Sequence, residues 1–102
     1  MAEDVEQCVA GGTLHGFTEA LGELYGRPMV EAGLARLPLE ERIQVEQAKA
    51  QLWVPIGILG RAVDAWAAAS GISDEELTVR GVRLSTRNAV NQVFRVLLRV
   101  TT

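Results

Sequence analysis

The sequence is poor in cysteine and histidine, and it has no long apolar run. Its single cysteine, Cys8, cannot form a disulfide within the chain, which suits a reducing cytoplasm. No stretch approaches the roughly 20 apolar residues that a membrane-spanning helix requires. Residues 1–13 carry acids and no basic residue, the opposite of the basic start of a secretory signal. We therefore expect a cytoplasmic protein with no membrane association.

The scarcity of reactive side chains also bears on catalysis. Cys8 and His15 are the only thiol and the only imidazole, and no dedicated motif surrounds either. A structural zinc site normally needs four Cys or His ligands, and no glycine-rich phosphate-binding loop is present. The sequence thus predicts no catalytic residue, no metal site, no cofactor and no enzymatic activity.

The 102 residues are 48% hydrophobic and 23% charged, with a formal net charge of −3. This length fits one domain with a real core. Residues 1–50 contain nine acids against four basic residues, a net charge of −5, whereas residues 51–102 contain six arginines against four acids, a net charge of +2. After Glu76 there are five arginines and no acid. The small net charge is therefore the sum of an acidic N-terminal half, the acidic front of the chain, and a basic C-terminal half.

Apolar residues recur at helical spacing through most of the chain. We expect an N-terminal arm over residues 1–13, either frayed or forming one short strand, and a single helical domain over 14–102. The pattern predicts helices over 14–25, 28–36, 38–52 and 55–69, and one starting at Asp74. The helix over 38–52 should turn Leu39, Ile43 and Ala50 inward. The predicted fold class is all-α, a compact bundle of five to six helices with a long C-terminal helix.

The start of the last helix has the sharpest local signal. Ser73 and Glu76 form a capping box, and Ile72 and Leu77 can form the accompanying hydrophobic staple. One apolar face then continues to the end of the chain, which favours helix to about residue 98. The alternation of apolar residues with arginine over 93–100 also fits a strand, so both alternatives stay open. The apolar face consists of Val79, Val82, Val90, Val93, Leu97 and Val100.

Five arginines fall within about 160° of one another on the same helix, at about 100° per residue. They are Arg80, Arg83, Arg87, Arg95 and Arg99. The first interpretation is a solvated face whose arginines pair with acids of their own domain. The second is an acidic partner or the acidic front of another copy of the chain. The third is nucleic acid, which we expect to be unfavourable because the chain is acidic overall.

The two tryptophans flank the proline at residue 55. Residues this large are mostly core or interface anchors. The alternative is an apolar small-molecule pocket with Trp53, Trp66 and Phe17 as its walls.

Several short motifs together resemble a known family. They are Gly12-Thr13-Leu14, Leu24-Tyr25-Gly26, the run from Leu37 to Arg42, Trp53-Val54-Pro55, Arg80-Gly81-Val82-Arg83 and the run from Val93 to Leu97. In this order, over residues 12–99, they resemble the helical N-terminal half of an uncharacterised domain family of myxobacteria and related deltaproteobacteria. That family is distantly similar to sensory domains of the haem-NO-binding and 4-vinyl-reductase type.

The resemblance implies a sensory or regulatory helical module. Relatives continue into a sheet-forming stretch that this sequence lacks, so we expect an apolar helix face to be left uncovered. The haem-ligating histidine and its tyrosine-serine-arginine signature have no counterpart here, because His15 lies too early, which argues against haem. The leading hypothesis is a protein-interaction module that self-associates. Its predicted interface has Phe94, Leu97 and Leu98 in contact and Arg80, Arg83 and Arg87 for polar steering.

Overall fold

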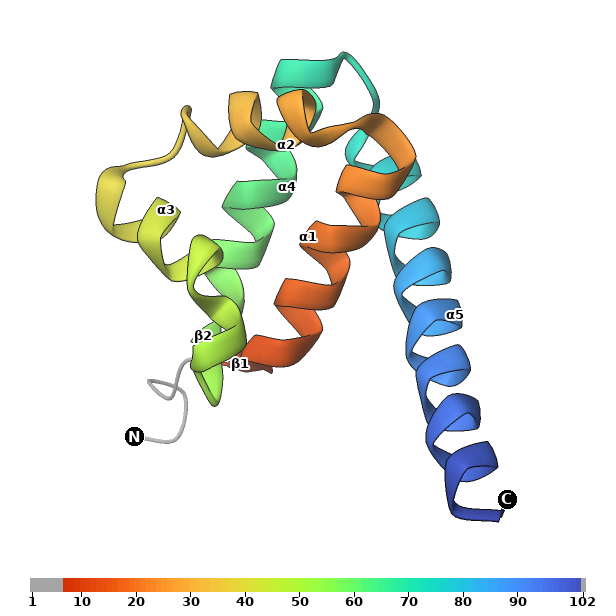
Figure 1. Ribbon diagram of the computed structural model, residues 1–102. Coiled ribbons are helices and arrows are strands. Elements are labelled where there is room, and N and C mark those ends of the chain that lie inside the picture. Colours follow the sequence, from red (N-terminus) through yellow and green to blue (C-terminus); the bar gives the residue numbers. More distant parts are fainter. Residues whose placement is uncertain (1–6, 102) are drawn as a thin grey trace.

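The computed structural model describes residues 7–101 and shows a bundle of helices tied together by one short two-stranded ladder (Figure 1). Residues 1–6, nearly half of the predicted N-terminal arm over 1–13, lie outside the described residues. The predicted all-α fold with a long C-terminal helix is confirmed. The elements are, in chain order, β1 (Cys8–Ala10), α1 (Gly11–Tyr25), α2 (Arg27–Leu34), α3 (Leu39–Glu46), a 3₁₀ turn (Ala48–Ala50), β2 (Trp53–Pro55), α4 (Ile56–Ser70) and α5 (Asp74–Thr101).

Glycines end two of the helices where the sequence predicts a break. Gly26 follows α1 with a φ of 93°, and Gly71 follows α4 with a φ of 76°. Residues with a side chain rarely adopt such angles, whereas glycine adopts them at little cost. At the end of α4, the Gly71 N–H donates a hydrogen bond to the Ala67 carbonyl at 2.9 Å, which satisfies one of the last carbonyls of the helix.

The third helix is shorter than predicted. α3 ends at Glu46, and the chain continues through the 3₁₀ turn into β2 instead of remaining helical to residue 52. Leu39, Ile43 and Ala50, which the periodicity turned inward, are exposed, so this part of the prediction is wrong. Val45 is the buried side chain of α3. The break occurs at Gln47, whose φ of −104° and ψ of 16° are not helical.

The ladder joins the start of the described chain to its middle. β1 and β2 pair antiparallel, with Val9 opposite Val54. Gly11 N–H donates to the Leu52 carbonyl at 3.2 Å, and Ile56 N–H donates to the Gln7 carbonyl at 2.8 Å, which extends the pairing at both ends. Because the pairing is antiparallel, the first turn of α1 lies beside the 3₁₀ turn and Gln51, and α4 begins at the other end of the ladder, next to Gln7.

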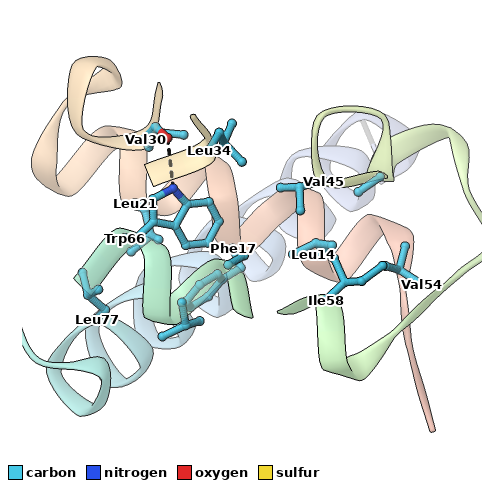
Figure 2. Close-up of a cluster of buried hydrophobic side chains, with 13 residues drawn as sticks. Leu14, Phe17, Leu21, Val30, Leu34, Val45, Val54, Ile58, Trp66 and Leu77 are labelled. Carbon is cyan, nitrogen blue, oxygen red and sulfur yellow. Dashed lines mark hydrogen bonds between the residues drawn. The ribbon is translucent and has the colours of Figure 1, made fainter. Parts of the chain in front are cut away.

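The core lies between α1, α2 and α4 and is closed by the first turns of α5 (Figure 2). Its largest fully buried side chain is Trp66, whose Nε1 donates a hydrogen bond to the Val30 carbonyl at 3.0 Å. Gly33 lies directly against the indole ring, in a position where a methyl group would overlap the ring. Phe17 packs beside Trp66 with 6.1 Å between ring centroids. Trp66 therefore anchors α4 to α2 and contacts α1.

α5 begins where the capping box predicts. The Ser73 hydroxyl accepts a hydrogen bond from the Glu76 N–H at 3.1 Å, and Leu77 behind it is buried in the core. The helix then continues without a break to Thr101. The strand alternative over 93–100 is wrong. In Figure 1 the last turns of α5, drawn in dark blue, extend clear of the other helices.

Candidate interaction surface

The first half of α5 packs its inner side on the domain. Leu77 is fully buried, and Leu84 and Ser85 are half-buried. Gly81 is also buried, and an added methyl group there would meet the ring of Phe17. Glycine thus allows α5 to approach α1 closely at this point. Asn88 adds to this contact a 3.1 Å hydrogen bond from its side-chain amide to the Glu23 carboxylate.

The other side of α5 is open along its whole length. Every residue from Thr86 to Val100 is exposed, and Val79 and Val82 are exposed as well. Val79 retains 47% of its accessible surface, Phe94 60% and Leu98 62%. The apolar stripe predicted from the sequence is therefore present and exposed, and two of its members, Val82 and Val90, also line the space between α5 and α1. The predicted contact residues Phe94, Leu97 and Leu98 belong to this exposed part.

The sequence of the exposed half of α5 contributes little to the stability of the helix. Residues 86–101 include four valines, two threonines and two asparagines, each of which costs up to about 0.7 kcal/mol relative to alanine in a helix interior. In proteins most helical stability comes from packing an apolar face against another element. The stability of this half of the helix would therefore increase if another surface covered it.

The arginines of α5 differ from those of the rest of the domain in their partners. Arg27, Arg42 and Arg61 each pair with a glutamate, the last at 2.7 Å from Glu41. On α5, Arg80 pairs with Glu76 at 3.4 Å. Within residues 7–101, no ion pair forms at the remaining four arginines of the helix, which are Arg83, Arg87, Arg95 and Arg99. The first interpretation, in which the five arginines pair with acids of their own domain, therefore holds only for Arg80 within residues 7–101.

A groove runs between α5 and the neighbouring helices. Its deeper part, about 220 Å³, has apolar walls from Leu14, Phe17 and Val63 and hydroxyl groups from Thr78 and Ser85 at its edge. Its shallower part continues along the start of α1. The residues there are small or short, which leaves the backbones accessible: Gly12, Thr13, Gly16, Ser85, Thr86, Ala89 and Val90.

The three residues predicted to wall a ligand pocket do not lie together. Phe17 and Trp66 pack on each other in the core, and Trp66 is fully buried. Trp53 lies in β2, ahead of the first turn of α4, and retains 60% of its accessible surface. Of the three, only Phe17 reaches the groove. The sequence did not indicate the small residues of the groove, because hydropathy gives glycine, serine and threonine little weight.

The only thiol and the only imidazole lie on the first two elements of the described chain. Cys8 is exposed on β1, and His15 is half-buried on α1. Within residues 7–101, no three Cys, His, Asp or Glu side chains are grouped so that they could hold a metal ion. One acidic pair is notable, because a side-chain hydrogen bond with Asp64 raises the pKa of the exposed Asp74 carboxyl above its ordinary value.

Comparisons with protein families, with functionally characterised proteins and with solved structures find no match to this chain. The resemblance described above therefore remains a prediction. Among the described residues, no helix combines the length and the apolar content needed to cross a bilayer.

Proposed function

We propose that the chain is a non-enzymatic, regulatory helical module for protein interaction, and that it docks through the exposed side of α5. The partner is another protein or a second copy of the chain. The observation that carries the proposal is the unbroken exposure of residues 86–100, in which Val90, Val93 and Leu97 continue an apolar stripe. Contiguous apolar surfaces of this kind are typical of interaction sites.

The charges around the stripe support the same function. Four arginines of α5 have no acidic partner within residues 7–101, so they can steer and orient an incoming acidic surface without first breaking an ion pair. Rim charges of this kind affect association rate and salt dependence more than they affect final affinity. Arg83 and Arg87 lie in the first half of the helix, which packs on the domain, and Arg95 and Arg99 lie in its last two turns.

Sedimentation together with binding of a dye specific for exposed apolar surface tests this proposal. We expect dye binding in dilute solution, and its loss when a partner covers α5 or when Val93 and Leu97 are both changed to serine. The matched control changes Asn91 and Gln92 to serine, which alters the same part of the helix outside the stripe. A monomer that binds no dye and is insensitive to the Val93→Ser/Leu97→Ser change would contradict the proposal.

The groove favours a second candidate function, the recognition of a small uncharged molecule. Its deeper part is apolar, has no charged residue in its walls and has a volume of about 220 Å³, which is enough for a ligand of one or two rings because a cavity of roughly 150 Å³ holds benzene. A ligand that binds only the folded state raises the melting temperature, and the rise grows with the logarithm of the ligand concentration once that exceeds the dissociation constant. A thermal-shift screen of small aromatic compounds, repeated on Leu59→Phe to fill the groove, tests this function.

A further inference from the structure

The exposed side of α5 has a second regular pattern in addition to the apolar stripe. Apolar or small residues occur at alternating steps of three and four, which is the heptad spacing of paired helices. All of them are exposed, and they lie on a different side of the helix from the buried Leu77 and Gly81. This set, called the valine series below because five of its seven members are valines, is Val79, Val82, Thr86, Ala89, Val93, Val96 and Val100.

From this series we infer that two copies of the chain pair antiparallel along α5. The inference rests on the proposed function, and it names the partner as a second copy. Between Val79 and Val96 the steps are three, four, three, four and three, so the series reads the same in both directions. A reversed copy therefore matches it position for position. Val79 meets Val96 of the other copy, Val82 meets Val93, and Thr86 meets Ala89.

The register set by the valines also uses the whole helix. Its centre falls between Arg87 and Asn88, which is the midpoint of α5 over Asp74–Thr101. The 28 residues of one helix therefore overlap all 28 of the other, a contact about 42 Å long at about 1.5 Å per residue. Because each α5 packs on its own domain near its start, the two domains would lie at opposite ends of the pair.

Charge favours the antiparallel direction over the parallel one. Glu75 lies one heptad step before Val82, so a parallel pair would place the two Glu75 side chains opposite each other. In the antiparallel register Glu75 instead meets Val100 and lies beside Arg99 of the other copy, an arginine with no ion pair within residues 7–101. Antiparallel helices also place the positive end of each helix dipole beside the negative end of the other, which is favourable.

The groove adds to the contact that two helices alone would make. Thr86 and Ala89 belong both to the valine series and to the shallow part of the groove, where Gly12 and Gly16 of α1 leave room for a close approach. We expect the total buried area to fall at the small end of specific interfaces, for which about 1,600 Å² is usual. We therefore expect a dissociation constant in the micromolar range.

Sedimentation equilibrium of the full chain from low micromolar to near-millimolar concentration measures this association. We expect a monomer–dimer equilibrium in which Val93→Lys raises the dissociation constant more than tenfold, because each dimer then holds two charged side chains against Val82. The matched control is Asn91→Lys, which adds the same charge to the same helix outside the valine series and should leave the constant within twofold. A monomer at every concentration would overturn the second copy as the partner, while the dye experiment above still decides the proposed function.

Cysteine cross-linking measures the direction of the helices. Val79→Cys and Val96→Cys are made separately in a Cys8→Ser background, and each folds as well as its parent because both positions are exposed. We expect the equimolar mixture to form a disulfide between the two variants, and each variant alone to form little. In the antiparallel pair two copies of residue 79 are about 26 Å apart, beyond any disulfide. Efficient cross-linking of either variant with itself indicates a parallel pair and would overturn the inference, leaving the proposed function intact.

Discussion

The two halves of α5 are built from similar residues but have opposite surroundings. In the first half, Leu77 and Gly81 are buried against the core and against Phe17. In the second half, every side chain from Thr86 to Val100 is exposed, valines and leucines included. The difference shows that an apolar residue becomes part of the core only where its own chain supplies a neighbour. A helix that extends beyond its neighbours leaves the same kind of side chain exposed to solvent.

The largest expected effect is at Trp66, in the packed region. Replacing Trp66 with alanine removes the largest buried side chain and leaves the Val30 carbonyl without its 3.0 Å hydrogen bond. We expect a loss of about 3–5 kcal/mol in the free energy of unfolding, measured by chemical denaturation. A loss below about 1 kcal/mol would contradict the structure of the core described here.

A matched pair of valines compares the two regions directly. Val54 is fully buried in β2, whereas Val93 is exposed on α5. In dilute solution we expect Val54→Ala to cost about 1–3 kcal/mol of unfolding free energy. We expect Val93→Ala to change it by less than about 0.5 kcal/mol. If the two substitutions lowered the unfolding free energy of the monomer equally, the distinction between the packed and the open region would be contradicted.

A pair of charge substitutions extends the comparison to the arginines. The Arg61 Nε–H donates a hydrogen bond that is shared between the two carboxylate oxygens of Glu41, each 2.9 Å from Nε, and this contact links α3 to α4. Because the Arg61 side chain is about half exposed, we expect Glu41→Gln to cost no more than about 1 kcal/mol and to cost less as salt is added. Arg99→Gln should leave the stability of the monomer unchanged. Denaturation at low and high ionic strength checks both expectations.

The smallest expected effect is a pH dependence at the turn before α5. The hydrogen bond with Asp64 raises the pKa of Asp74 in the folded chain. Between the ordinary and the raised value, the folded state binds more protons than the unfolded state, so stability falls as the pH rises through that interval. Asp64→Asn should remove this slope in melting experiments at acidic pH. An unchanged slope in the variant would show that Asp64 is not its cause.

Local signals in the sequence predicted three of the helix boundaries. The Ser73–Glu76 capping box placed the start of α5, and Gly26 and Gly71 placed two helix ends, because each signal depends only on residues within one turn. The extended geometry expected at Val54 is also confirmed, since the residue lies in β2. Where structure depends on a few neighbouring residues, the sequence was sufficient.

Predictions that needed a direction in space were less successful. The periodicity identified the valine stripe of α5 but could not say that the stripe remains exposed, because the inner contact uses Gly81, which has no side chain. Trp53 is exposed because adjacent residues of a strand point to opposite sides, and the buried side at β2 belongs to Val54. The helix expected over 38–52 stops at Gln47, where no proline or glycine marks the break.

The unlike settings of the two tryptophans give the protein a built-in optical readout. Trp66 is sealed in the core and hydrogen-bonded to the backbone of α2, whereas Trp53 is largely in water. A soluble quencher should therefore suppress the emission of Trp53 first, and the remaining bluer emission should report whether α2 and α4 are still together. With Trp53→Phe, the fluorescence of the native chain would follow the integrity of the core alone.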